Sequence, residues 1–210
     1  MVDRAELEKS LRAVREAHGV LDAFHREVVA FLQIVDEQLG EDGQGAALTP
    51  LDPNNVVWTS TAKVSNSTEW TPRTIGRLYG DDALDVDEGA EETPESMAAA
   101  MVSIHACVDD GLAECWFAFG RPGEGTRYRG SAATSGAWNF ARNGLWNYAM
   151  DTPALGAWAD GTFTRSAYGT GGIWHVSRVS LLDLTNADQV RERVAKPLLN
   201  RWKKVIRGLP

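Results

Sequence analysis

Apolar residues recur at alternating steps of four and three along the N-terminal part of the chain. This heptad spacing predicts one long amphipathic helix, from about Arg4 to Leu39, with a single apolar stripe. At about 1.5 Å per residue the helix would span about 54 Å. Few domains in a chain of 210 residues could cover such a stripe alone. We therefore expect a second helix or another chain to lie along it. The stripe consists of Leu7, Leu11, Val14, His18, Leu21, His25, Val28, Leu32, Val35 and Leu39.

Two histidines interrupt this stripe. His18 and His25 occupy the same heptad position one repeat apart, so in a parallel dimer their copies would face each other. We interpret them as partly exposed residues; the alternative is a register or pH device, because a protonated imidazole in an apolar seam is costly. Gly19 costs about 1 kcal/mol relative to alanine and is a point at which the helix can break. The predicted oligomer seam, which would form a coiled coil, comprises His18, Leu21, His25, Val28 and Leu32.

The middle of the chain carries strand patterns. Apolar and polar residues alternate between Asn55 and Val64, which predicts a strand, whereas residues 66–77 look irregular. The clearest hairpin turns at Asp109-Asp110-Gly111 and would set Cys107 opposite Cys115 as reduced neighbours. A short helix is expected at Ser135–Met150. The two predicted hairpins join Met97–Val108 to Leu112–Phe119 and Gly161–Tyr168 to Ile173–Leu182.

The chain closes with an amphipathic helix at residues 186–207, capped by Thr185 or Asn186 and kinked or split by Pro197. Together these elements predict an α+β fold, in which a mainly antiparallel sheet built from hairpins is flanked on one face by the long N-terminal helix and the C-terminal helix. The expected organisation is a helix at residues 1–40, a linker at 41–54 and an α+β domain at 55–210.

Charge narrows the range of partners. The net charge is −8, which disfavours non-specific attraction to nucleic acid or to an anionic membrane. Residues 81–95 hold eight acidic side chains and no basic one, which indicates a solvated loop or a docking site for a basic partner. The chain has no run of about 18 apolar residues, so we expect no membrane partner. Its first residues are charged, unlike a signal peptide, so we expect a cytoplasmic location.

No catalytic motif stands out. Phosphate loops, dinucleotide-binding glycine patterns, His-Glu-x-x-His and Gly-x-Ser-x-Gly are all missing from the sequence, and we expect neither a cofactor nor a metal. A restriction-type nuclease would need a lysine two residues after Glu114, where Trp116 stands. An enzyme of the hydrolase or nuclease class would have to assemble its site from distant residues. The catalytic candidates are His105, Asp109, Glu114 and His175.

The chain has eight tryptophans, and three of them lie near arginines in a glycine-rich region. Arginine combined with aromatic rings can form a recognition surface for a protein or for single-stranded nucleic acid. Because the net charge is negative, we favour a protein partner. The candidate binding residues are Arg127, Arg129, Trp138, Arg142, Trp146 and Trp158.

These observations lead to three functional hypotheses. The first is a non-enzymatic protein-interaction or assembly module that acts as a homo-oligomer or within a complex. The second is an enzyme whose site is assembled on the sheet, which requires its candidate residues to converge in one pocket. The third is nucleic-acid binding through the basic face of the C-terminal helix, which predicts an affinity that falls steeply with salt and is lost on charge reversal at Arg193, Lys196 and Lys203.

Overall fold

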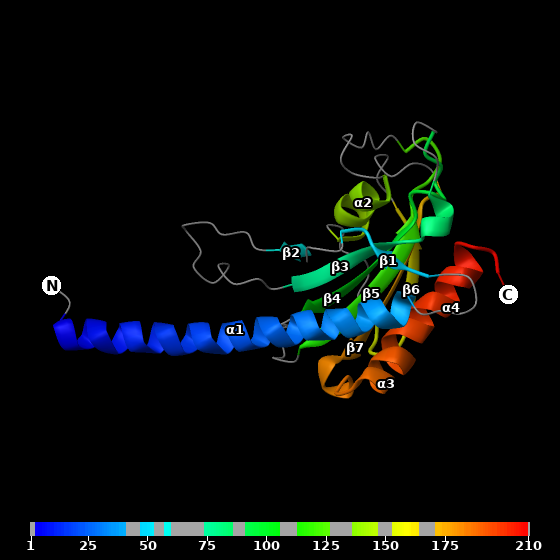
Figure 1. The fold of residues 1–210 in the computed structure, drawn as a ribbon. Coiled ribbons are helices and arrows are strands. Elements are labelled where there is room, and N and C mark those ends of the chain that lie inside the picture. The colour runs from blue at the N-terminus through cyan, green and yellow to red at the C-terminus, as the bar shows by residue number, and fades with distance from the viewer. Residues whose placement is uncertain are drawn as a thin grey trace.

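The computed structural model describes residues 3–40, 47–52, 57–59, 74–85, 91–105, 113–126, 136–146, 153–163 and 171–209. It confirms the predicted α+β class, with helices at both ends of the chain and a sheet between them (Figure 1). The helices are α1 (Arg4–Gly40), α2 (Gly136–Phe140), α3 (Ala187–Val190) and α4 (Lys196–Val205). The strands are β1 (Thr49–Pro50), β2 (Val57–Thr59), β3 (Thr74–Gly80), β4 (Ala99–His105), β5 (Glu114–Arg121), β6 (Trp158–Thr162) and β7 (Ile173–Ser180).

The described strands form one seven-stranded sheet in the order β1-β3-β4-β5-β7-β6, and β2 also pairs with β3. Every pairing is antiparallel. The predicted pairing of Met97–Val108 with Leu112–Phe119 is present as β4–β5, but its register is shifted by three residues, because Cys115 lies opposite Ile104 instead of Cys107. The predicted second hairpin is present as β6–β7, with its first strand at Trp158–Thr162 instead of Gly161–Tyr168. Cys107 lies outside the described residues, and Cys115 is a free, buried thiol whose pKa burial raises far above the usual value.

Strand β3 was missed, because most of it falls in the stretch that was predicted to be irregular. Its two glycines obscure the strand pattern, yet Gly76 is required there. A Cβ at this position would lie 2.4 Å from the carbonyl oxygen of Val102 and 2.7 Å from the Cβ of Ser103, so only glycine allows β3 to approach β4 this closely.

The sheet has two buried faces. We call the one covered by α1, α3 and α4 the helical face, and the one covered by α2 and the π-helical turn Ala141–Trp146 the α2 face. Alternate residues of each strand point to opposite faces, as the period of two requires. The helical face buries Ile75, Tyr79, Val102, Ile104, Cys115, Phe117, Phe119 and Val179. The α2 face buries Leu78, Ala99, Met101, Ala118, Trp174 and Val176.

Helix α1 runs unbroken through Gly19, and its stripe meets two environments. The last four stripe residues are buried on the helical face, with Val28 3% exposed and Leu32 1%. The first stripe residues are open to solvent, with Leu7 50%, Leu11 60% and Val14 53% exposed. The N-terminal half of α1 accordingly extends away from the sheet, as Figure 1 shows. The domain thus covers only the C-terminal part of the stripe.

A polar contact fixes the rotation of α1 about its axis. Arg77 Nη1 donates to Asp36 Oδ2 at 2.6 Å, and the Tyr79 hydroxyl donates to Asp36 Oδ1 at 2.9 Å. Both donors come from β3. Burial raises the pKa of Asp36, although these two contacts oppose the rise. Because Asp36 directly follows Val35 of the stripe, its bonds to β3 hold the apolar side of α1 against the sheet.

The C-terminal helix begins as predicted. The Asn186 side chain accepts a hydrogen bond from the Gln189 backbone N–H at 2.9 Å and so caps α3. A π-helical turn, Arg191–Ala195, separates α3 from α4 and directly precedes the segment that contains Pro197, so the helix is split there. Its apolar residues Val190, Val194, Leu198 and Trp202 are buried on the helical face.

Asp81 differs from the predicted solvated loop, because it is 4% exposed and joins β3 to the C-terminal helix. Its carboxylate accepts from Trp202 Nε1 at 3.1 Å and from Arg207 Nη1 at 3.0 Å. A buried carboxylate needs such donors to offset its lost hydration. The first residue of the acidic run is therefore a structural anchor.

Helix α1 is long, but many of its side chains are charged or polar. In the described part of the chain, no helix combines the length and the apolarity that crossing a membrane requires.

We predict that Asp81→Asn destabilises the protein by about 1.5–3 kcal/mol, because the neutral amide weakens bonds to a partly buried guanidinium and to a buried indole. Asp183→Asn is the matched control, since it breaks a pair with Arg193 in which both side chains are about half exposed. The control should change stability by less than about 1 kcal/mol. Urea unfolding of both variants measures the difference, and equal effects would contradict the anchoring role of Asp81.

Candidate functional site

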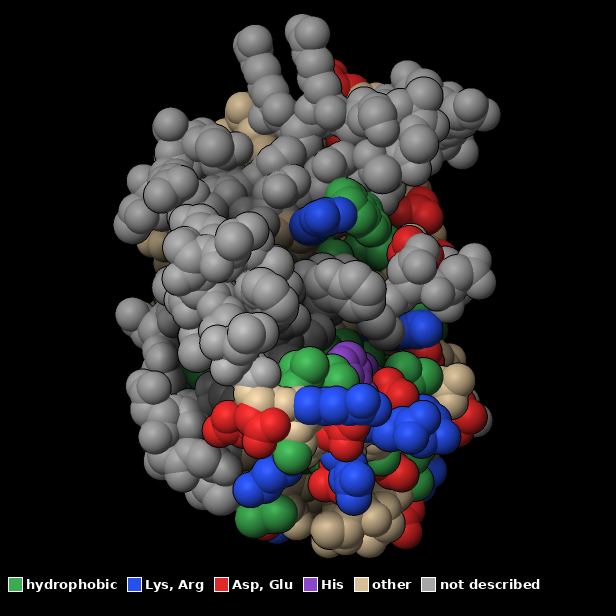
Figure 2. Space-filling model, turned by 90° about the vertical axis from the view of Figure 1, so that its left-hand side faces the viewer, with side chains coloured by type: hydrophobic (Ala, Val, Ile, Leu, Met, Phe, Trp, Pro, Cys, Tyr) green, Lys and Arg blue, Asp and Glu red, His purple; other side chains and the backbone are tan. Residues whose placement is uncertain are grey.

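The N-terminal part of α1, residues Arg4–Val20, is exposed at every position, and we call it the projecting segment. Its length is about 25 Å at about 1.5 Å per residue. The apolar stripe and flanking charges lie on its surface, including an Arg4–Glu8 ion pair at 3.0 Å. Figure 2 views the molecule from the side toward which α1 extends, and the described side chains in its lower part mix both signs of charge with hydrophobic groups.

An apolar notch of about 190 Å³ lies where α1 leaves the sheet, and we call it the junction notch. Val28 is the one residue of the stripe that lines the notch, beside Phe24 and Phe31 of α1. Glu27 supplies the single charged group of its lining. The notch is lined by Phe24, Glu27, Val28, Phe31, Ile104, Leu181 and Leu184.

Two catalytic candidates meet on the α2 face. His105 and Glu114 are direct partners across β4 and β5, and both project to the side of Ser103 and Trp116. The Ser103 hydroxyl and His105 Nε2 lie 3.1 Å apart, and the His105 ring stacks on Trp116 with ring centroids 4.9 Å apart. This arrangement brings a hydroxyl, an imidazole and a carboxylate into one cluster.

The Glu114 carboxylate of this cluster accepts hydrogen bonds from two other side chains. Arg178 Nη1 donates to both carboxylate oxygens, at 2.7 and 2.9 Å, and Trp116 Nε1 donates to Oε2 at 2.9 Å. The carboxylate thus accepts from an arginine and an indole, whereas a catalytic triad needs it to orient the histidine. Ser103 is fully buried. Burial lowers the pKa of His105 to about 4, against the opposing charge of Glu114, so the imidazole is neutral near pH 7.

The other described candidate lies elsewhere. His175 projects from the helical face, where it stacks on Phe119 and its Nδ1 lies 2.7 Å from Asp160 Oδ1. Burial lowers the pKa of His175. Asp109 lies outside the described residues. His105 and His175 are therefore separated by the sheet, and the convergence that the enzyme hypothesis requires does not occur among the described candidates.

The aromatic candidates are divided in the same way. Trp158 lies on the helical face, against Phe117 and Phe119 and below Arg201, whose guanidinium carbon is 4.8 Å from its ring centroid. Trp138 lies in α2 on the opposite side of the sheet, with the Arg142 guanidinium 5.0 Å above its ring. This contact joins one arginine and one tryptophan of the candidate binding residues. Arg127, Arg129 and the side chain of Trp146 lie outside the described part of the structure.

The basic face of the C-terminal helix is largely neutralised. Arg193 pairs with Asp183, Lys196 with Glu192, and Arg201 with Asp160. Arg207 is bound to Asp81, and Arg191 pairs with Asp188 and also donates to Gln38 of α1. Because phosphate binding needs cations free to replace counterions, these pairs weaken the basis of the nucleic-acid hypothesis.

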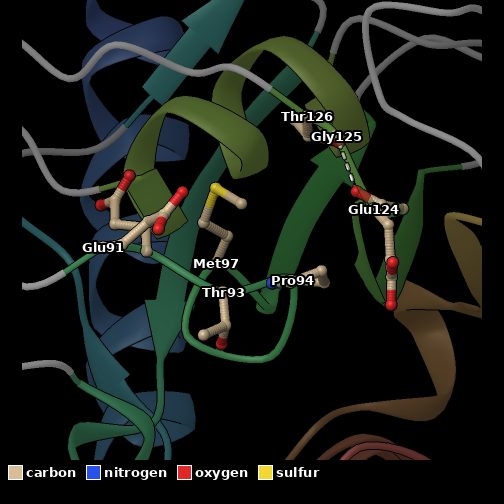
Figure 3. Close-up of a pocket in the computed structure, with 9 residues that line it drawn as sticks. Glu91, Thr93, Pro94, Met97, Glu124, Gly125 and Thr126 are labelled. Atoms are coloured by element: carbon tan, nitrogen blue, oxygen red, sulfur yellow. Dashed lines mark hydrogen bonds between the residues drawn. The ribbon is translucent and has the colours of Figure 1, made fainter.

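A second cavity, of about 420 Å³, lies beside the described end of the acidic run (Figure 3). Glu91, Glu92 and Glu124 line it together with Met97 and Thr126. Glu92 already has a structural role, because its Oε1 accepts from the Gly136 backbone N–H at 2.6 Å at the start of α2. Among the described residues, no group of three or more His, Cys, Asp and Glu side chains is arranged to hold a metal ion.

Comparison with known proteins finds no significant similarity: no family model, no curated protein and no solved structure matches the chain.

We predict that the stability of the protein falls as the pH drops from about 6.5 to about 4, because the unfolded chain then binds a proton that folded His105 excludes. The slope from one such group is at most about 1.4 kcal/mol per pH unit. His105→Gln removes that contribution. The free energy of unfolding of this variant should therefore fall by about 1–2 kcal/mol less than that of the wild type between pH 7 and pH 5. Urea unfolding at both pH values tests this; an unchanged loss in the variant would contradict it.

Proposed function

We propose that this protein is a non-enzymatic interaction and assembly module whose contact element is the projecting segment of α1. The observation that carries the proposal is the division of one continuous heptad stripe into a buried half and an exposed half. The buried half explains the stripe at residues 28–39. Among the described residues of the domain, none covers Leu7, Leu11 and Val14, which continue the same stripe into solvent.

The energetics of an isolated helix support this proposal. A helix of this length without tertiary contacts is marginally stable in water, and most helices in proteins are stabilised by burial of an apolar face. Gly19 weakens the segment further, by about 1 kcal/mol. A partner that covers the stripe would supply the missing burial, at about 1.5–3 kcal/mol for each fully buried leucine or valine. The burial that a partner would supply thus supports an interaction role for the exposed apolar groups.

We predict that Leu11→Lys abolishes assembly without unfolding the domain, because it places a charge in the centre of the exposed stripe. The matched control is Ala13→Lys, which adds the same side chain within the same turn but on the opposite side of the helix. Light scattering and sedimentation should show a dissociation constant raised about a hundredfold or more for the first variant only.

Two outcomes would contradict the proposal. Assembly that survives Leu11→Lys would exclude the stripe as the contact. A wild-type protein that is strictly monomeric and captures no partner through the stripe would remove the assembly function itself. The urea midpoint of each variant shows whether the domain remains folded.

A further inference from the structure

We infer that the occupant of the projecting segment is the same segment of a second copy, lying antiparallel so that Leu11 faces the partner's Val14 and Leu7 faces the partner's His18. This inference rests on the assembly function proposed above and deepens it by naming the partner and its direction. It is carried by the placement of the domain on the helix, by the length of the exposed stripe and by the charges that flank the stripe.

The placement of the domain excludes a parallel pair. The stripe residues Val28, Leu32, Val35 and Leu39 face the sheet of their own chain. A parallel partner in register would follow the same stripe into the space that the sheet occupies. A parallel pair would also stack His18 on its own copy and, by the heptad rule, set Asp3 beside the partner's Glu8. An antiparallel partner leads its domain away in the opposite direction and meets neither obstacle.

The length of the exposed stripe fits this arrangement. When Leu11 lies opposite the partner's Val14, Arg4 of one chain lies opposite Leu21 of the other. Leu21 is the first residue of α1 that is partly buried, whereas Arg4–Val20 are all exposed. The partner helix thus covers the open stripe from its start to the point where the sheet takes over. The two domains lie at opposite ends of the helix pair and do not collide.

The flanking charges select the register. Glu8, Arg15 and Asp22 occupy equivalent positions on one flank of the stripe in successive heptads. In the proposed register Glu8 lies beside the partner's Arg15, and by symmetry the pair occurs twice. A shift by one heptad in one direction sets Glu8 against the partner's Glu8. A shift in the other direction sets Arg15 against the partner's Arg15. The opposite flank carries the small residues Ser10 and Ala17, which allow close approach of the helices.

The junction notch lies at the end of this path. The partner helix begins beside Leu21, one turn before Phe24 of the notch. The notch therefore adds apolar surface close to the end of the path that the antiparallel partner follows.

Cysteine cross-linking tests the direction of the pair. We would prepare Leu7→Cys and His18→Cys in the full chain with Cys107→Ser, leaving the buried Cys115 in place. In the antiparallel pair residue 7 meets residue 18 of the other chain, so a mixture of the two variants should form a disulfide-linked heterodimer on oxidation. Each variant alone should remain reduced, because its two thiols would lie about 16 Å apart along the axis, beyond the limit of about 7 Å between Cα atoms.

The outcomes separate the inference from the function on which it rests. Cross-linking of each variant with itself, and not in the mixture, would overturn the antiparallel direction while leaving an assembly through α1 intact. No cross-linking together with a monomeric wild type in light scattering would overturn both self-association and the direction. In that second case, capture of a different protein that Leu11→Lys abolishes would still support the assembly function.

Charge reversal tests the register independently of cysteine chemistry. Glu8→Arg sets two arginines against each other, and Arg15→Glu sets two glutamates against each other. Each single variant should raise the dissociation constant about tenfold, and the double variant should recover most of that loss, because the interchain pairs re-form with reversed sign although the Arg4–Glu8 pair does not. Lys9→Glu, which reverses a charge on the outer side of the helix, is the control. Failure of the double variant to recover would overturn the register.

Discussion

The structure depends on the burial of a single apolar stripe of α1 against the helical face of the sheet. Val28, Leu32, Val35 and Leu39 form one core with residues of β4, β5 and the C-terminal helix. The Asp36 contacts with Arg77 and Tyr79 hold that stripe inward. Since a helix transmits its rotation along its whole length, these contacts also set the direction in which Leu7, Leu11 and Val14 face. The domain thereby fixes the orientation of a surface that it does not cover.

Buried polar groups close the rest of the fold. Asp81 bonds Trp202 and Arg207, which ties the end of β3 to the C-terminal helix. On the α2 face Glu114 is bound by Arg178 and Trp116, so it links β5 to β7. In each case one carboxylate satisfies donors from distant parts of the sequence, which stabilises a particular packing instead of general collapse. The donors that Glu114 accepts from beside His105 are therefore also contacts that hold the sheet together.

The sequence predicts what local periodicity encodes. The heptad steps from Leu7 to Leu39 indicated α1, and alternation around the Asp109-Asp110-Gly111 turn indicated the β4–β5 hairpin, so the fold class followed. Features that depend on contacts between distant segments did not follow. Gly76 obscured the strand pattern of β3. Glycine is needed at this position because β3 approaches Ser103 of β4 too closely for a Cβ. The burial of Asp81 depends on Trp202 and Arg207, and the cluster around His105 depends on the pairing of β5 with β7 that brings Arg178 to Glu114. The separation of His105 from His175 likewise depends on sheet register, which composition does not reveal.

The divided stripe also explains why the helix is longer than its domain. If the exposed half only stabilised α1, a helix that began near Leu21 would serve equally well and would avoid Gly19. A straight segment of about 25 Å instead holds whatever it joins at a fixed distance from the sheet, because a paired helix does not bend as a loop does. In an antiparallel pair that distance separates two identical domains. Each copy would then present its α2 face, with Trp138 beneath Arg142, at a set spacing from the other.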